Sequence, residues 1–256
     1  AIPVVTQAAT SDGLGNSYQT TYTYRGGLYD AATTEFRGFQ TTTVTDAVGT
    51  TTTTTFAQDL HTKGHPLSVE VRDSAGRLYT KTTNTWSCTE PHPGVHFTKL
   101  DQADGFVYDG DSSFRQTRSR FTYDAYGNVT AASADGEPGI LGDERSTTTT
   151  YTLNTSAWIL DKPSFIQILN DAGAVVAQRR FTYDGAANSS DAPAKGSLTK
   201  EEEWLYPDPA NPADPAGTWL ATTLSYDIYG NVASVSDALG RTTTNTYDPT
   251  TRTYLI

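Results

Sequence analysis

Hydrophobic and polar residues alternate with a period of two along parts of the chain, which is the pattern of β-strands. From Arg118 to Tyr123, arginine and threonine alternate with serine and aromatic residues. Threonine runs favour the same conformation, because a β-branched residue suits a pleated backbone and its hydroxyl suits the wet face of a sheet. These runs lie at residues 41–43, 50–55, 147–150 and 242–244. No segment has the pattern of a helix of ordinary length, so the sequence predicts an all-β fold.

A short phrase repeats along the chain. Residues 123–129 read Tyr-Asp-Ala-Tyr-Gly-Asn-Val, and residues 226–232 differ from them at one position. The Tyr-Asp dipeptide returns elsewhere, at intervals close to multiples of about 20 residues, which is typical of repeat architectures. A unit this short is too small to fold alone. We identify these structural repeat residues: Tyr123, Asp124, Gly127, Asn128, Tyr183, Asp184, Tyr226, Asp227, Gly230, Asn231, Tyr247 and Asp248.

A second phrase, Asp-x-x-Gly-Arg, falls between the Tyr-Asp pairs. It occurs at residues 73–77 and again at Asp237, Gly240 and Arg241. An aspartate side chain accepts hydrogen bonds from the backbone two residues on, and glycine adopts the positive φ that hairpin turns require. The phrase therefore predicts a turn, and each repeat predicts one strand-turn-strand unit.

Composition supports sheets with little aliphatic core. Hydrophobic residues make up 36% of the chain, and 15 Tyr, 9 Phe and 4 Trp supply much of that share. The net charge of −11 argues against nucleic-acid binding, which requires a basic surface. Cys88 is the only cysteine, so no internal disulfide can form, and no apolar run has the length of a membrane span. The chain contains no Met, so we expect a fragment of a longer protein.

The Tyr-Asp-x-x-Gly-Asn and Asp-x-x-Gly-Arg phrases resemble the YD repeats of the Rhs family. The amino-terminal third resembles the middle region of the B component of bacterial Tc insecticidal toxins, a family related to the SpvB-like virulence proteins. This resemblance rests on residues 24–30, on Lys63-Gly64 and Trp86, and on a family motif formed by Glu35, Phe36, Arg37, Gly38 and Phe39. We therefore expect two segments: a Tc-toxin B middle-like β segment at residues 1–100 and a YD-repeat β segment at residues 101–256.

The resemblance implies a curved sheet strip of β-hairpins, part of a hollow Rhs-type shell that encloses a cytotoxic cargo and delivers it. The expected function is non-catalytic and structural, in a secreted or cell-surface toxin complex with a role in virulence. The implied partners are the rest of the parent protein and its toxin cargo or C-type partner. No cofactor, nucleic acid or membrane span is expected.

The strongest candidate for metal chemistry is Cys88 with His92 and His96, near Glu90 and a further pair, His61 and His65. Cysteine and histidine are zinc ligands, but Pro91, Pro93 and Gly94 place the first three in an irregular loop. Their spacing matches no recognised zinc-finger pattern, so we expect loop residues rather than a zinc hydrolase. No nucleophile motif is present, and the acidic phrases at residues 101–105 and 109–111 read as turns rather than calcium loops.

Exposed aromatic residues among threonines suit an extracellular carbohydrate-binding module that contacts cell-surface glycan, which is the alternative function. The proline-rich residues 206–215 should form an exposed excursion, with shorter loops at 186–196 and 135–143. In the family motif, Glu35 and Arg37 should face one side of a strand and form ion pairs or backbone bonds, while Gly38 allows a bend or bulge.

Overall fold

The computed structural model of the chain describes residues 2–108, 110–206 and 217–256. It divides into two compact units, Ala1–Gly127 with Ser133–Glu144 and Asn128–Ala132 with Arg145–Ile256. The proline-rich excursion expected at residues 206–215 lies, apart from Tyr206, outside the described residues. The division into units rests on contacts within the fold, so the family boundary expected near residue 100 stays a prediction.

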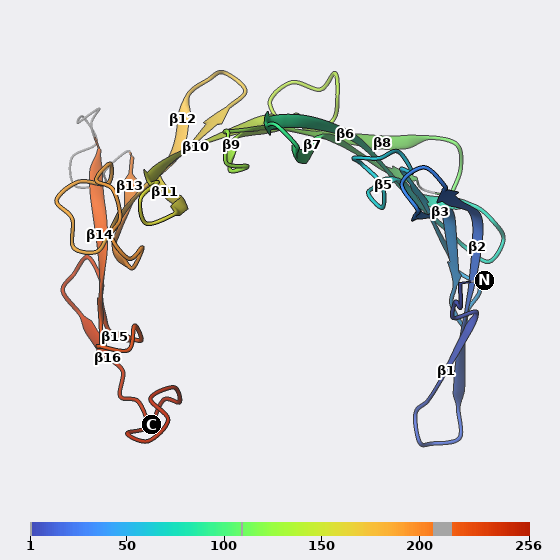
Figure 1. Ribbon diagram of the computed structural model, residues 1–256. Coiled ribbons are helices and arrows are strands. Elements are labelled where there is room, and N and C mark those ends of the chain that lie inside the picture. Colours follow the sequence, from blue (N-terminus) through green and yellow to red (C-terminus); the bar gives the residue numbers. More distant parts are fainter. Residues whose placement is uncertain (1, 109, 207–216) are drawn as a thin grey trace. The chain divides into compact units, whose positions relative to one another are not determined.

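The described residues of the first unit form eight antiparallel strands. Each of them pairs with the next along the chain (Figure 1). The strands are β1 (Gln7–Ser11), β2 (Ser17–Asp30), β3 (Glu35–Thr45), β4 (Thr51–Phe56), β5 (Pro66–Arg72), β6 (Leu78–His92), β7 (Val95–Tyr108) and β8 (Phe114–Tyr123).

The second unit repeats this arrangement, with successive antiparallel pairs from β10 onward. Its strands are β10 (Arg145–Asn154), β11 (Ile159–Asn170), β12 (Val175–Tyr183), β13 (Leu198–Leu205), β14 (Thr218–Tyr226), β15 (Val232–Ser236) and β16 (Thr242–Thr244). Strand β9 (Val129–Ala134) has residues in both units. Strand order follows chain order throughout, so the predicted all-β fold of hairpins is confirmed.

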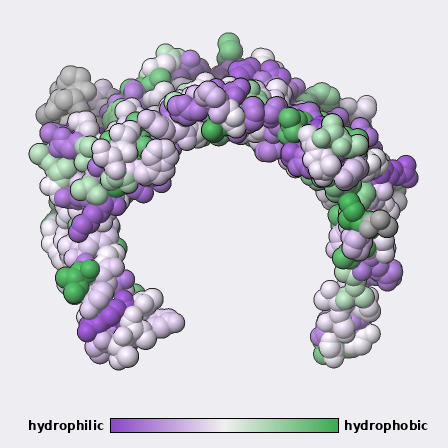
Figure 2. Space-filling model, viewed as in Figure 1, coloured by the Kyte–Doolittle hydropathy of each residue, from purple (hydrophilic) through white to green (hydrophobic). Residues whose placement is uncertain are grey.

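Each unit is a curved single layer of strands (Figure 1), and within its described residues the strands contact only their neighbours in sequence. Burial is correspondingly shallow. Apart from Pro193, only Ala57 and Tyr183 are buried among the aliphatic and aromatic residues that the structure describes. Figure 2 shows hydrophilic and hydrophobic residues mixed over the visible surface. Each unit is therefore stabilised by backbone hydrogen bonds and side-chain contacts between its adjacent strands rather than by a central core.

The connection at residues 186–196 differs from the exposed loop that the sequence predicts. It packs against β10 instead of projecting outward: Pro193 is fully buried, and Thr152 donates to the carbonyl of Asp191 at 2.9 Å. The sequence predicts an exposed loop here, because the small polar residues of the segment give no sign that it packs against β10. In the described part of the chain, no helix is long and apolar enough to span a bilayer.

Candidate functional site

One structural device recurs along the strands of both units. An aromatic residue follows a threonine or serine, and the pairing register shifts between the two, as at a β-bulge. In each case the extra residue lies on the following strand, opposite the step from the threonine or serine to the aromatic residue. The shift directly precedes Phe56, Trp86, Tyr151, Tyr183 and Tyr226.

In the second unit the tyrosines form a chain of hydrogen bonds. The hydroxyl of Tyr183 donates to the carbonyl of Pro163 at 2.9 Å, and Pro163 is the ladder partner of Tyr151. Tyr226 then donates to Leu198, the ladder partner of Tyr183, at 2.7 Å. The pattern continues, because Tyr247 donates at 3.1 Å to Val232, the partner of Tyr226. We call this set of aromatic residues and their acceptor carbonyls the aromatic ladder.

The aromatic ladder also occurs in the first unit, with different side chains. Tyr123 donates to the carbonyl of Leu100 at 2.9 Å, and Leu100 is the ladder partner of Trp86. The indole of Trp86 donates to Pro66 at 2.9 Å, and Pro66 is paired with Phe56. Tyr123 and Trp86 therefore each tie their own strand to the residue that pairs with the preceding aromatic residue of the series, whereas Phe56 has no polar atom to donate.

The Tyr-Asp repeat predicts four of the ladder tyrosines, Tyr123, Tyr183, Tyr226 and Tyr247, but it does not include Phe56, Trp86 and Tyr151. These residues lack the following aspartate. The signal that includes them is the dipeptide of threonine or serine before an aromatic residue, as in Thr55-Phe56, Thr85-Trp86 and Thr150-Tyr151.

Burial perturbs the ladder tyrosines. Tyr183 is only 6% exposed, and desolvation, reinforced by the charges of Asp161 and Glu201, raises its pKa from 10.0 to about 12. Desolvation also raises the pKa values of Tyr123 and Tyr226. The hydroxyls therefore stay protonated and donating throughout the physiological range.

The Asp-x-x-Gly-Arg phrases close hairpins by one hydrogen-bond pattern. One carboxylate oxygen of Asp237 accepts from the backbone N–H groups of Leu239 and Arg241, both at 2.9 Å. Its other oxygen accepts from Nε of Arg241 at 2.6 Å, and Gly240 has φ of +77°. Asp73 makes the corresponding bonds to its own turn, including one from Nε of Arg77 at 2.8 Å.

These bonds stabilise the ionised carboxylates. The backbone N–H of Arg77 lowers the pKa of Asp73, and that of Arg241 lowers the pKa of Asp237. The side-chain amide of Asn231 does the same for Asp227. The asparagine also reaches beyond its turn, since Asn231 donates to the carbonyl of Arg252 at 2.8 Å.

The other repeat residues occupy related but distinct positions. Asn128 donates to the carbonyl of Leu160 at 2.6 Å, and Asp124 and Gly127 form the preceding turn. Asp184 departs from the pattern, because its carboxylate closes the long 185–196 connection by accepting from four consecutive N–H groups, those of residues 194–197. Asp248 accepts from the N–H groups of Thr250 and Thr251.

The family motif lies at the start of β3 and contains a bulge. Phe36 pairs with Tyr29 and Phe39 with Gly27, so Arg37 and Gly38 together face a single residue of β2. Gly38 has φ of +86°, and Gln58 donates to its carbonyl at 3.0 Å. The bulge brings the rings of Phe36 and Phe39 together at 5.3 Å, edge to face.

The charged residues of the motif form ion pairs with the surrounding connections. Glu35 pairs with Lys63 at 2.8 Å, and Arg37 pairs with Asp30. Arg37 also contacts the carbonyl of Gln58. The motif thus fastens the 57–65 connection to the end of the β2–β3 hairpin.

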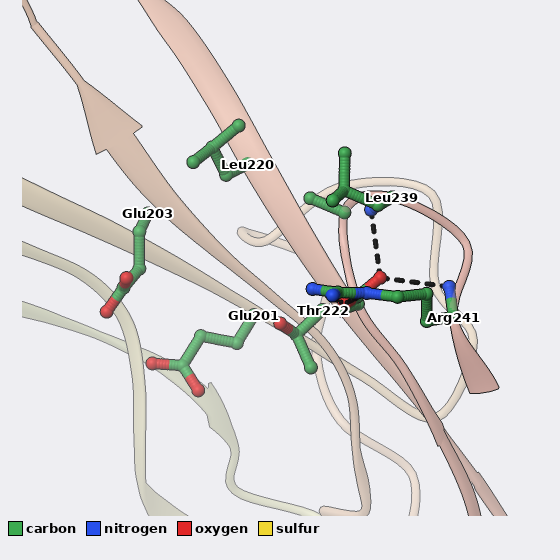
Figure 3. A pocket seen from close by; sticks show the side chains of 8 residues that line it. Glu201, Glu203, Leu220, Thr222, Leu239 and Arg241 are labelled. Carbon is green, nitrogen blue, oxygen red and sulfur yellow. Dashed lines mark hydrogen bonds and ion pairs between the residues drawn. The ribbon is translucent and has the colours of Figure 1, made fainter. Parts of the chain in front are cut away.

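A shallow hollow in the second unit is lined by residues of β13, β14 and the β15–β16 turn (Figure 3): Glu201, Glu203, Leu220, Thr222, Asp237, Ala238, Leu239 and Arg241. Its charged groups are engaged locally. Glu201 and Glu203 face Arg179 at 3.7 and 2.7 Å, and Asp237 is occupied by its own turn. The hollow is therefore a depression in the sheet face whose charged side chains bind Arg179 or their own turn.

The sequence prediction that Cys88, His92 and His96 lie in an irregular loop is wrong, because Cys88 and His92 are on β6 and His96 is on β7. His61 joins Cys88 and His96 in one group whose potential ligand atoms lie within 4.8 Å of one another, whereas His92 is not part of that group. The sequence pairs His61 only with His65, because the approach of His61 to Cys88 and His96 depends on the path of the 57–65 connection.

The comparisons with known proteins agree with the fold. Residues 1–68 match the family model described as the middle/N-terminal region of the insecticide toxin TcdB. No curated protein sequence gave a match. The structure of TcdB2-TccC3 aligns with 94% of this chain at 14% identity and a TM-score of 0.66. A Photorhabdus luminescens Tc holotoxin pore aligns with 91% at 13% identity and a TM-score of 0.63.

The chain spans about a fifth of each of these structures, 21% of the first and 20% of the second. At such low identity the structural likeness establishes the fold, while the family model covers the amino-terminal segment that carries the Glu35–Phe39 motif. The resemblance to the middle region of the Tc toxin B component, predicted from the sequence, is therefore confirmed.

Proposed function

We propose that this chain is a non-catalytic wall segment of a shell that encloses a cytotoxic cargo and delivers it. The observation that carries the proposal is its single-layered hairpin fold, which aligns over 94% of its length with the TcdB2-TccC3 structure. A sheet that extends by adding hairpins forms a barrier without a globular core, and stability is then a sum of neighbour contacts.

The aromatic ladder suits this role. Each ladder bond joins adjacent strands, so any stretch of wall is held by its own contacts whatever its total length. The buried hydroxyl bonds contribute about 1 kcal/mol each by the usual measure of protein hydrogen bonds. The acidic turns then fix the hairpin ends.

The partners follow from the same proposal. They are the remainder of the parent protein and a cargo-bearing chain comparable to the TccC3 of the aligned complexes. The assembly would act as a secreted or cell-surface toxin complex. The repeat phrases correspond in this view to the YD repeats of Rhs proteins.

Neighbouring residues on opposite faces of β14 provide the test. Leu220 lines the hollow of Figure 3 together with Thr222, whereas Ala221 points to the other face by strand alternation. We would introduce Leu220→Cys or Ala221→Cys into the parent protein with Cys88→Ser, assemble it with its cargo-bearing partner, and label with a bulky hydrophilic maleimide.

A wall predicts that one of the two cysteines is protected in the closed assembly and becomes reactive when the assembly is opened with denaturant. The unassembled chain should label at both positions and serves as the control. Equal labelling of both positions in the closed assembly would contradict enclosure.

The alternative of a carbohydrate-binding face is less well supported by the aromatic residues. Trp204 stacks on Tyr206 at 4.8 Å, and the guanidinium of Arg180 covers the ring of Trp219 at 3.6 Å. Trp86 is a member of the aromatic ladder. Trp158, at 76% exposed, remains as an open platform, and a glycan array with Trp158→Ala as the control would test it.

A further inference from the structure

We propose that His61, Cys88 and His96 form a binding site for a zinc-type divalent cation in the first unit. Their potential ligand atoms lie within 4.8 Å of one another. One thiolate and two imidazoles are ligands that zinc prefers, and a thiolate disfavours calcium and magnesium. This site is separate from the proposed wall function and does not depend on it.

The β6–β7 hairpin places two of the ligands on one face. Cys88 on β6 lies opposite Thr98 on β7. His96 is two residues before Thr98 on the same strand, so its side chain projects to the same face as that of Thr98. Cys88 and His96 are therefore diagonal neighbours across the pair, a spacing within reach of their side chains.

The connection between β4 and β5 brings in the third ligand, and several contacts hold it there. The hydroxyl of Thr98 donates to the carbonyl of His61 at 2.7 Å. Asp59 accepts from the N–H groups of His61 and Thr62, at 3.0 and 2.9 Å. The hydroxyl of Thr62 also donates to Asp59. His61 is thus positioned before any cation arrives.

The distances suit closure around an ion. The rings of His61 and His96 have their centroids 3.9 Å apart. Ligand atoms of a tetrahedral zinc ion with bonds of about 2.0 to 2.3 Å lie about 3.3 to 3.8 Å apart, so small side-chain rotations complete the site. His96 is exposed, which leaves a fourth position open to water.

The other potential metal ligands nearby are engaged in other contacts or lie outside the group. Nδ1 of His65 lies 3.0 Å from the carbonyl of Thr62, and its ring packs on Trp86 at 4.4 Å. Glu90 accepts from the N–H of Gly94 at 2.6 Å in the hairpin turn. His92 pairs with Val95 at the end of the hairpin, outside the group. Three named residues therefore define the site.

The test is stoichiometric metal binding by the purified chain. The protein is stripped with a chelator, loaded with Zn²⁺, separated from free ion by gel filtration and analysed for zinc. We expect one zinc per chain and, with Co²⁺, a thiolate-to-cobalt absorption band. Each of His61→Ala, Cys88→Ser and His96→Ala should weaken zinc affinity at least tenfold, while His92→Ala should leave it unchanged.

The His61 and His92 variants distinguish this site from the Cys88, His92 and His96 set suggested by spacing alone. Loss of binding in His92→Ala with retention in His61→Ala would overturn the assignment. So would a chain that retains no stoichiometric zinc. Circular dichroism of each variant shows whether a loss of binding reflects a loss of fold, and a folded Cys88→Ser chain that still binds zinc with undiminished affinity would also overturn it.

Discussion

The hydroxyl of Tyr183 on β12 donates to the carbonyl of Pro163 on β11 at 2.9 Å, although Pro163 is also the ladder partner of Tyr151 on β10. Proline has no N–H, so its position in the sheet lacks one ladder donor. Its carbonyl nevertheless has a buried partner from the opposite neighbour. One residue thus receives contacts from the strands on both of its sides, and the same geometry recurs at Pro66, which accepts from Trp86 and pairs with Phe56.

This relationship predicts the cost of removing one hydroxyl. Tyr183→Phe keeps the ring and leaves the Pro163 carbonyl without that donor, so the free energy of unfolding should fall by about 1 to 2 kcal/mol. Urea denaturation followed by tyrosine fluorescence or circular dichroism measures it. Tyr229→Phe is the matched control, since Tyr229 is 57% exposed and outside the aromatic ladder. Equal effects of the two substitutions would refute a structural role for the ladder bond.

The same tyrosine predicts an alkaline dependence of stability. Its pKa is about 12 in the folded chain and about 10 when exposed, so between these values the folded state keeps a proton that the unfolded state has lost. The contribution of Tyr183 is therefore complete below pH 10 and decreases as the pH rises to 12, by about 3 kcal/mol in total.

Comparison with Tyr183→Phe isolates this effect from the other titrating groups. The difference in free energy of unfolding between the original chain and the variant should shrink and then reverse sign as the pH rises from 9 to 12, because only the original chain carries the buried hydroxyl. A difference that stays constant over this range would show that Tyr183 ionises normally in the folded state.

The Asp-x-x-Gly-Arg turns were predictable from sequence because their determinants are local. The turn expected at residues 101–105 was wrong, since these residues lie within β7. Asp73 and Asp237 contact atoms no more than four residues away, and glycine supplies the backbone conformation within the same phrase. The all-β fold was predictable for a similar reason, since alternation and threonine content report on single strands. The family motif was recognisable as a phrase, although the contact of Phe36 with Phe39 depends on the bulge between them.

Contacts between distant segments were not predictable in the same way. Trp86 and Tyr151 belong to the aromatic ladder through register shifts, and alternation along one strand does not reveal a shift against the next. His61 approaches Cys88 only because the 57–65 connection folds over the β6–β7 hairpin. The buried Pro193 likewise depends on the packing of a long connection on β10.

A glycine substitution tests the turn mechanism. Gly240 has φ of +77°, and an added Cβ would meet no atom within 4 Å, so Gly240→Ala changes backbone strain alone. We expect a loss of about 1 to 2 kcal/mol in the free energy of unfolding, from the cost of a left-handed conformation in a residue with a side chain. Leu239→Ala, at an adjacent residue that is 79% exposed, should change the stability by less than about 0.5 kcal/mol.

Asp104 on β7 predicts the behaviour of the chain in acid. This carboxylate is 8% exposed. Burial raises its pKa, but hydrogen bonds from Arg118, Gln102 and Gln116 together outweigh burial and hold it below 3.8. Their distances are 2.6, 2.6 and 2.9 Å. The unfolded chain therefore binds a proton before the folded chain does, so this stabilisation is complete well above pH 3.8 and is lost as the pH falls through the lower folded value.

Asp104→Asn should reduce the free energy of unfolding at pH 7 by about 1 to 3 kcal/mol, because it leaves the half-buried Arg118 without its counter-charge. It should also flatten the fall in stability between pH 5 and pH 2, since the variant has no carboxylate to protonate at this position. Asp161→Asn is the matched control, because Asp161 pairs with Lys162 at 3.3 Å while 70% of its side chain is exposed. An Asp104→Asn chain with the stability and acid dependence of the Asp161→Asn chain would mean that the Asp104 cluster contributes no more than a surface ion pair, and the first unit would then owe its acid resistance to its turns.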